Sequence, residues 1–187
     1  MPLALNCLPT FFPPQLTLLG LSLRTLLLLT KPSVVAVNGL AVGGAANIAL
    51  ANYHDIVLAS TDAYFKYPFA ELGITPELGS SFVIPLMAGM TRAKNLMMMA
   101  PKFTAEEAKE MGLVLEVTKP EDLMDRARHY AETLASRDQS GLRANKKLMN
   151  HHFRKMMGAV LEEENVVLNE RFLALVKKMA PPKKAKM

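Results

Sequence analysis

The stretch Lys31–Ser81 limits the possible folds more than any other part of the chain. It begins with a β-branched run at 33–38, continues through a Gly-Gly pair into an apolar segment with helical spacing, and reaches a second β-branched run at 55–60. A loop interrupted by prolines then carries two carboxylates, Glu71 and Glu77. This order of strand, turn, helix, strand and loop predicts an α/β domain.

The turn Gly43-Gly44 is the first candidate for chemistry. Glycine lacks a Cβ atom, so a ligand can approach the backbone closely. The free N–H groups at the start of the following helix, supported by the helix dipole, favour an oxyanion. Taken alone, however, a Gly-Gly pair more often marks a plain tight turn that packs a helix on a strand.

The loop supplies the second candidate. Glu71 and Glu77 stand among apolar residues such as Phe69, Leu72 and Leu78. A carboxyl group in apolar surroundings has a raised pKa, which suits it to proton transfer near neutral pH. For either glutamate taken alone, a solvated loop residue is the simpler interpretation.

The chain resembles the enoyl-CoA hydratase/isomerase (crotonase) superfamily over a long ordered pattern. The segments that carry the resemblance are VAVNGLAVGG, HDIVLAS, AYFKYPFAELGITPELGSSF and FTAEEAKEMGLVLEV. The resemblance implies a partial crotonase core, a ββα spiral, at 31–119, followed by a C-terminal helical region at 120–178. It also implies an acyl-CoA substrate, with coenzyme A as part of the substrate and no separate cofactor, and a homotrimer or hexamer.

The carboxylates separate the chemistries within this superfamily. Hydratases carry one Glu on the helix after the glycines and another after the Pro of an F-x-x-P segment, where this chain has Asn47 and Phe69. The segment Pro76–Ser81 instead resembles the P-E-x-x-S-S loop of Δ3,Δ2-enoyl-CoA isomerases, especially the peroxisomal type. The resemblance implies that Glu77 is the catalytic base and that the Gly44 N–H donates to the thioester oxygen. It places Asn47, Phe69 and Leu72 at the substrate.

The leading hypothesis is therefore an isomerase that converts 3-enoyl-CoA to 2-enoyl-CoA in fatty-acid β-oxidation. A second is an enoyl-CoA hydratase that uses Glu71. A third is a non-catalytic crotonase-like protein that binds acyl-CoA or assembles with relatives, because the first strands and first oxyanion loop of the family domain have no counterpart in this sequence. A fourth is a membrane-associated protein built on the leucine-rich segment 15–30, but Arg24 within that segment argues against a stable span.

Composition and charge bear on disulfides, on binding partners and on the cellular location. Of residues 1–30, the first fourteen match nothing in the family, whereas the leucine-rich stretch 15–30 resembles the family helix that leads into the first strand. The chain has one cysteine, Cys7, so an internal disulfide is excluded. The net charge of +5 comes from five lysines near the C-terminus: Lys177, Lys178, Lys183, Lys184 and Lys186. Three of them lie in the basic tail at 179–187, and the rest of the chain is balanced to about zero, so the charge does not indicate nucleic acid as a partner. Ala185-Lys186-Met187 fits a peroxisomal address and predicts a peroxisome or glycosome, with mitochondrion or cytoplasm as the alternative.

The segments after the carboxylate loop are predicted to be structural. The methionines at 87–99 have helical spacing and predict core packing, or else a pocket for an acyl chain. Thr104 and Glu107 predict a capping box, Gly112 predicts the end of that helix, and a strand is expected at 113–117.

Three amphipathic helices are predicted beyond Pro120, over about 123–134, 142–156 and 161–175. The pair Lys146-Lys147 is interpreted as part of a solvated face, with contact to a CoA phosphate as the alternative. No metal site is predicted, since the adjacent His151 and His152 cannot share one helix face.

Overall fold

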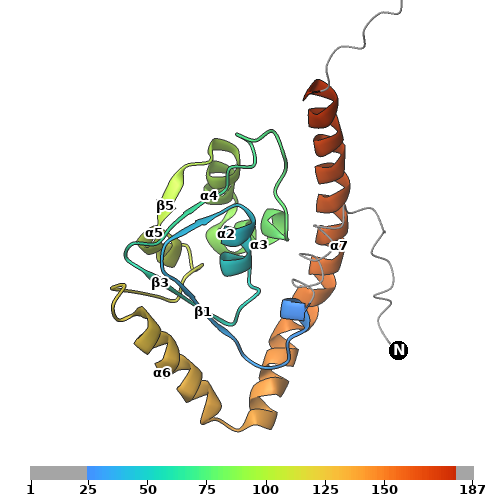
Figure 1. The fold of residues 1–187 in the computed structure, drawn as a ribbon. Helices are drawn as coiled ribbons and strands as arrows, with labels where there is room; N and C mark the ends of the chain where they lie inside the picture. Colours follow the sequence, from blue (N-terminus) through green and yellow to red (C-terminus); the bar gives the residue numbers. More distant parts are fainter. Residues whose placement is uncertain (1–24, 180–187) are drawn as a thin grey trace, which may run out of the picture.

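The computed structural model describes residues 25–179, which form a mixed α/β body with a long helix beside it (Figure 1). Predictions for residues 1–24, including Cys7 and Arg24, and for the tail that ends in Ala185-Lys186-Met187 lie outside these residues. Of the predicted leucine-rich helix, the described part is helical over 25–28.

Two three-stranded sheets form the body. In the first, β1 (Val34–Val37), β3 (Ile56–Ser60) and β6 (Glu116–Thr118) lie parallel in the order β1-β3-β6. In the second, β4 (Tyr64–Lys66) pairs parallel with β2 (Leu40–Val42) and antiparallel with β5 (Lys102–Thr104). Each successive pair of strands therefore gives one strand to each sheet, which is the arrangement expected for a ββα spiral.

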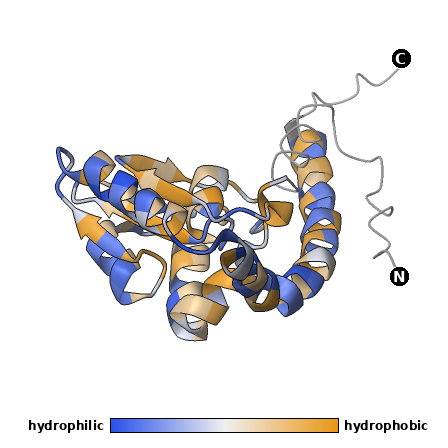
Figure 2. Ribbon diagram, turned by 90° about the horizontal axis from the view of Figure 1, so that it is seen from below, coloured by the Kyte–Doolittle hydropathy of each residue, from blue (hydrophilic) through white to orange (hydrophobic). Residues whose placement is uncertain are grey.

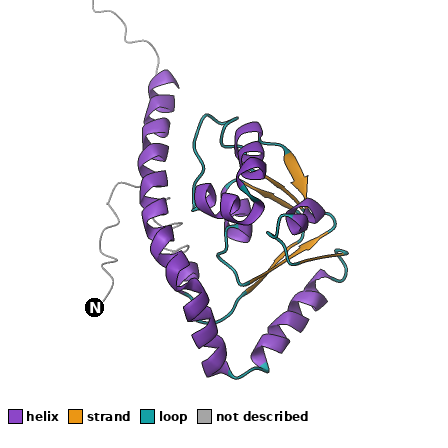
Figure 3. Ribbon diagram, turned by 180° about the vertical axis from the view of Figure 1, so that it is seen from behind, coloured by secondary structure: helices purple, strands orange, loops and turns teal. Residues whose placement is uncertain are grey.

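The helices lie between and after these strands. In chain order they are α2 (Gly44–Leu50), α3 (Ser80–Ala88), α4 (Met90–Lys94), the π-helical turn η1 (Asn95–Met99), α5 (Ala105–Glu110), α6 (Leu123–Ala135) and α7 (Gln139–Met179). Figure 3 shows α6 running to a corner from which α7 rises alongside the body.

Aromatic side chains from the second sheet form the centre of the largest apolar cluster. The rings of Phe65 and Phe103 stack with centroids 5.4 Å apart, and Tyr67 lies 5.7 Å from Phe103. All three are almost completely buried, together with alanines from α2 and α5. This packing fixes α2 against the sheet and thereby positions the Gly43-Gly44 turn.

The predicted capping box is confirmed. The Thr104 side chain accepts from the Glu107 N–H at 3.2 Å, and the Glu107 carboxylate accepts from the Thr104 N–H at 2.7 Å. The helix ends before Gly112, whose φ is 74°. The strand that follows begins later than predicted, because Leu113 and Val114 turn into the core and pairing starts near Glu116.

The prediction of two helices after residue 139 is wrong, since α7 is a single helix of 41 residues. Met157, Leu161 and Leu168 recur at helical spacing across the predicted break, and all are at least partly buried. A continuous contact face of this kind favours one helix despite Gly158. In Figure 2, apolar and polar colours alternate along α7.

The prediction that the methionines at 87–99 pack in the core is also mostly wrong. Met97 is buried, but the others of this group are among the exposed apolar side chains: Met87, Met90, Met98 and Met99.

Within residues 25–179, no helix combines the length and apolar composition that crossing a membrane requires. In the same part of the chain, no three His, Cys, Asp or Glu side chains come together as potential metal ligands.

Candidate active site

Glu77 lies in the loop before α3, and its backbone is held from two sides. The Asn47 Nδ2 donates to the Glu77 carbonyl at 2.8 Å, and the Ser80 Oγ and N–H donate to the same oxygen at 2.7 and 3.1 Å. Asn47 and Ser80 are both fully buried. The loop is therefore fixed to α2 on one side and to α3 on the other.

The Glu77 side chain reaches the start of α2. A Cβ atom built on Gly44 would lie 3.3 Å from Glu77 Oε1 and 3.5 Å from Leu78 Cδ1. Gly44 is the first residue of α2, so its N–H has no acceptor within the helix. The carboxyl group and the helix start thus lie side by side, and any larger residue at position 44 would crowd them.

The backbone after Glu77 takes an unusual course. Leu78 and Gly79 have φ values of 56° and 79°, and the first of these is uncommon for a residue with a side chain. The Tyr53 hydroxyl donates to the Leu78 carbonyl at 3.0 Å and supports this conformation. A Cβ atom at Gly79 would overlap the Met157 side chain, so α7 packs directly on the loop.

The electrostatic surroundings favour the neutral form of Glu77. Burial raises the pKa of its carboxyl group above the ordinary value, and the nearby Glu164 carboxylate of α7 raises it further. Burial also raises the pKa of Tyr53, and Glu164 and Glu77 add to that effect. Glu77 is therefore a carboxyl group whose proton affinity is increased, as a general base near neutral pH requires.

The other predicted site residues lie in different surroundings. Phe69 is only 2% exposed and packs in the core beside Tyr67, with ring centroids 5.9 Å apart. Leu72 is 58% exposed. The structure thus brings Glu77, Gly44 and Asn47 together, whereas Phe69 belongs to the core and Leu72 to the surface.

Glu71, the alternative base, forms an ion pair. Its carboxylate oxygens lie 2.9 and 2.7 Å from Lys66 Nζ, and its side chain is 51% exposed. An exposed, paired carboxylate lacks the apolar surroundings that favour a proton-transfer role.

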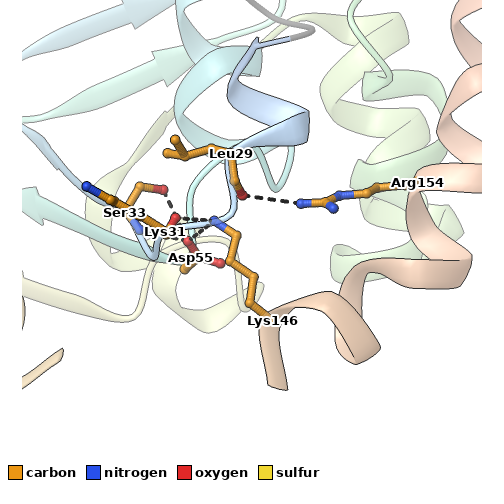
Figure 4. Close-up of polar contacts among 6 residues, drawn as sticks. All are labelled: Leu29, Lys31, Ser33, Asp55, Lys146 and Arg154. Atoms are coloured by element: carbon orange, nitrogen blue, oxygen red, sulfur yellow. Dashed lines mark hydrogen bonds and ion pairs between the residues drawn. The ribbon is translucent and has the colours of Figure 1, made fainter. Parts of the chain in front are cut away.

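The solvated-face interpretation of Lys146 is wrong. Figure 4 shows its ammonium group between α7 and the start of β1, where it donates to the Asp55 carboxylate at 2.6 Å and to the Lys31 carbonyl at 2.8 Å. Lys146 is 8% exposed, whereas its neighbour Lys147 is exposed. A long-range acceptor, Asp55, explains this burial, and helical periodicity alone could not reveal it.

Sequence reasoning also missed Tyr53 and Glu164. Glu164 belongs to the run Glu162-Glu163-Glu164, and it alone of the three is buried. It stands seven residues after Met157, on the same helix face. This spacing was the only signal in the sequence that could have distinguished it from its neighbours.

An open hollow of about 400 Å³ lies beside β1, β2 and α2, with Val35, Leu40 and Ile48 among its lining residues. Glu77 is not part of this lining. The candidate site is therefore defined by Glu77 and its contacts and not by an enclosed cavity.

Similarity to known proteins agrees with this arrangement. The sequence profile of the family described as "Enoyl-CoA hydratase/isomerase" matches residues 19–180. The 1,2-epoxyphenylacetyl-CoA isomerase of Escherichia coli (strain K12) is 38% identical over 127 residues, or 68% of this chain and 48% of the relative. Enoyl-CoA delta isomerase 2 of Rattus norvegicus is 35% identical over 144 residues, or 77% of this chain and 36% of the relative.

The fold is similar as well. The crystal structure of an enoyl-CoA hydratase/isomerase from Pseudoalteromonas atlantica T6c matches with a TM-score of 0.76 and 31% identity, over 85% of this chain and 67% of that one. This chain spans about half, or less, of the length of the two curated relatives. The profile match, the shared fold and the ββα arrangement of strands together show that the chain belongs to the enoyl-CoA hydratase/isomerase (crotonase) family.

Proposed function

We propose that this protein is a Δ3,Δ2-enoyl-CoA isomerase in which Glu77 moves the proton. The reaction breaks a C–H bond at C2 of the acyl thioester and forms one at C4, so that the double bond moves from C3 to C2. One carboxylate that reaches both carbons performs both transfers. The observation that carries the proposal is the Glu77 carboxyl group, which lies against the start of α2 and whose pKa is raised by burial.

The intermediate carries negative charge on the thioester oxygen, and we assign the Gly44 N–H as a donor to that oxygen. A fixed N–H aimed at a developing oxyanion commonly lowers the barrier by an amount worth about a hundredfold to a thousandfold in rate. The contact between position 44 and Glu77 supports this assignment, because it keeps base and donor close enough for one small substrate group to meet both.

Hydration is the weaker alternative. It uses two carboxylates to activate and add water, but the corresponding positions hold Asn47 and Phe69, which are both buried. Asn47 donates to the Glu77 backbone, and Phe69 packs against Tyr67. The two relatives described above are named as isomerases of different acyl-CoA compounds, so their names support an acyl-CoA substrate but do not fix which one.

Assembly is the second candidate function. Several apolar side chains of α7 are exposed: Val166, Val167, Phe172, Leu173 and Val176. Contact with further copies would cover them, and we propose a homotrimer or hexamer because the chain belongs to the crotonase family, whose C-terminal helices build such an interface. A purely assembling, non-catalytic protein would show the oligomer without turnover.

The decisive experiment follows conversion of 3-enoyl-CoA to 2-enoyl-CoA by the wild-type chain, Glu77→Gln and Glu71→Gln. We expect Glu77→Gln to lower kcat by roughly a thousandfold, within the range that general acid–base catalysis supplies. Glu71→Gln is the matched control and should retain turnover. Equal activity of wild type and Glu77→Gln would refute the proposal, and hydration that depends on Glu71 would support the hydratase instead.

We also propose a peroxisomal or glycosomal location on the basis of Ala185-Lys186-Met187. A fluorescent fusion that keeps these residues at its C-terminus should enter the organelle, and the same fusion without them should stay outside.

A further inference from the structure

We propose that Glu164, on α7, is a positioning residue for the Glu77 base, because its carboxylate holds the first turn of α3 and thereby the loop that carries Glu77. This inference rests on the proposed function. It assigns a catalytic consequence to a side chain that lies far from Glu77 in sequence and that does not itself exchange a proton with the substrate.

Three hydrogen bonds carry the argument. Glu164 Oε2 accepts from the Gly79 N–H at 2.7 Å, and Oε1 accepts from the Ser81 N–H at 2.9 Å and from the Ser81 Oγ at 2.5 Å. Glu164 is 7% exposed, so water has little access to the carboxylate and cannot readily take the place of these hydrogen bonds. Both oxygens of one carboxylate are therefore used to hold Gly79 and Ser81.

The start of α3 has no local cap of its own. Its N-cap residue is Gly79, which has no side chain to accept from the first N–H groups of the helix, and no acidic residue stands in the first turn. A carboxylate at a helix start is favoured by the helix dipole as well as by hydrogen bonds. Glu164 therefore replaces the missing cap from another part of the chain.

Packing of α7 fixes where Glu164 can lie. Met157, about two turns before Glu164, fills the space over Gly79. Leu168, about one turn after Glu164, is 2% exposed. Farther along, Arg171 Nε donates to the Gly73 carbonyl at 3.1 Å. Contacts on both sides of Glu164 thus hold α7 against the loop and leave its carboxylate little freedom.

The position of Glu77 depends on the same residues. Its carbonyl accepts from Ser80, which lies between the two residues that Glu164 binds. The charge of Glu164 also acts on Glu77 and on Tyr53, whose hydroxyl supports the same loop, and raises the pKa of each. Loss of Glu164 should therefore both loosen the loop and lower the pKa of Glu77.

The test compares Glu164→Gln with Glu163→Gln, a substitution of the adjacent exposed glutamate. Glutamine keeps one oxygen but turns an N–H₂ group toward a backbone N–H, so part of the cap is lost. We expect Glu164→Gln to lower kcat by roughly tenfold to a hundredfold with KM within about twofold, as displacement of a catalytic group does. The acidic limb of the pH profile should move to lower pH, and Glu163→Gln should match wild type in both readouts.

Hydrogen exchange gives a readout that does not depend on turnover. In Glu164→Gln the amides of Gly79 and Ser81 should exchange faster than in Glu163→Gln, while those of α6 stay unchanged. Unchanged exchange together with unchanged kcat would overturn the inference. If wild type lacks isomerase activity but the exchange difference is found, the proposed function fails while the contact of Glu164 with the loop stands.

Two further variants serve if Glu164→Gln does not fold. Ser81→Ala removes one of the three hydrogen bonds and should give a smaller loss of kcat in the same direction. Glu164→Asp keeps the charge, so its acidic limb should stay close to that of wild type although its shorter side chain lowers kcat. A Ser81→Ala enzyme with wild-type kcat and wild-type exchange at residue 79 would also count against the inference.

Discussion

Residues 31–119 bury the largest apolar cluster, whereas α7 contacts that body through a smaller apolar cluster around Met157 and through buried charged side chains. In the body, the rings of Phe65, Tyr67 and Phe103 pack against one another within one cluster. Along α7, Lys146 binds Asp55 and Glu164 binds the start of α3. An apolar core tolerates some rearrangement, but an ion pair or a helix cap requires one particular partner. The candidate site lies between the two regions. The body supplies the residues Gly44, Asn47 and Glu77, and the contacts of α7 fix the backbone conformation of the loop that carries Glu77.

Truncation of a core ring should give the largest effect on stability. Phe65 is fully buried, so Phe65→Ala removes packed apolar surface and leaves a cavity, which we expect to cost about 3–5 kcal/mol of unfolding free energy. Leu86→Ala is the control, because Leu86 is 62% exposed and its loss should cost less than about 1 kcal/mol. Urea denaturation of both variants measures the difference, and equal losses would contradict a common core around Phe65.

Removal of the Lys146 charge tests the attachment of α7. Lys146→Met keeps most of the side-chain volume but leaves Asp55 without its cation, and we expect a loss of about 2–3 kcal/mol. This value lies below the usual cost of breaking a buried pair because Asp55 is partly exposed and still accepts from the Ser33 N–H. Lys147→Met, at the exposed neighbour, should change the unfolding free energy by less than about 0.5 kcal/mol. Equal effects of the two substitutions would mean that the ion pair does not hold the helix.

A methyl group at Gly79 tests the contact between α7 and the loop that carries Glu77. Gly79→Ala places a side chain at a φ of 79° and against Met157, so we expect a loss of about 1–2 kcal/mol together with lower turnover. Gly39→Ala is the control, since a Cβ atom at Gly39 would have nothing within 4 Å. Thermal unfolding and initial rates of both variants provide the measurement. A stable, fully active Gly79→Ala protein would show that α7 does not constrain the loop.

The smallest effect concerns pH. The pKa of Glu77 is raised in the folded protein above its ordinary value of 4.5, so folding favours the protonated form. The corresponding stabilisation is complete below that ordinary value and is lost as pH rises through the folded pKa. We therefore expect Glu77→Gln to raise the Tm relative to wild type more at pH 7 than at about pH 4. A difference in Tm that is the same at both pH values would contradict the raised pKa.

Local patterns sufficed to predict the features that depend on neighbouring residues. The Thr104–Glu107 capping box, the strands Val34–Val37 and Ile56–Ser60 and the loop of Glu77 all follow from short segments. Contacts between distant segments could not be predicted in this way. Nothing near Glu164 in sequence indicates that it caps α3, and Lys146 differs from Lys147 only in facing Asp55. Separate apolar faces at 142–156 and 161–175 predicted two helices, but the continuous face from Met157 to Leu168 makes α7 a single helix.

The contacts of α7 have a consequence for how this segment can change in evolution. Lys146 and Glu164 reach their partners from the same continuous helix, so their relative direction is set by the helical repeat. Deletion of one residue between them would turn one part of the helix by about 100° relative to the other and shorten the reach by about 1.5 Å. Either the anchor at Asp55 or the cap on α3 would then be lost. This segment should therefore accept substitutions on its outer face but no change of length.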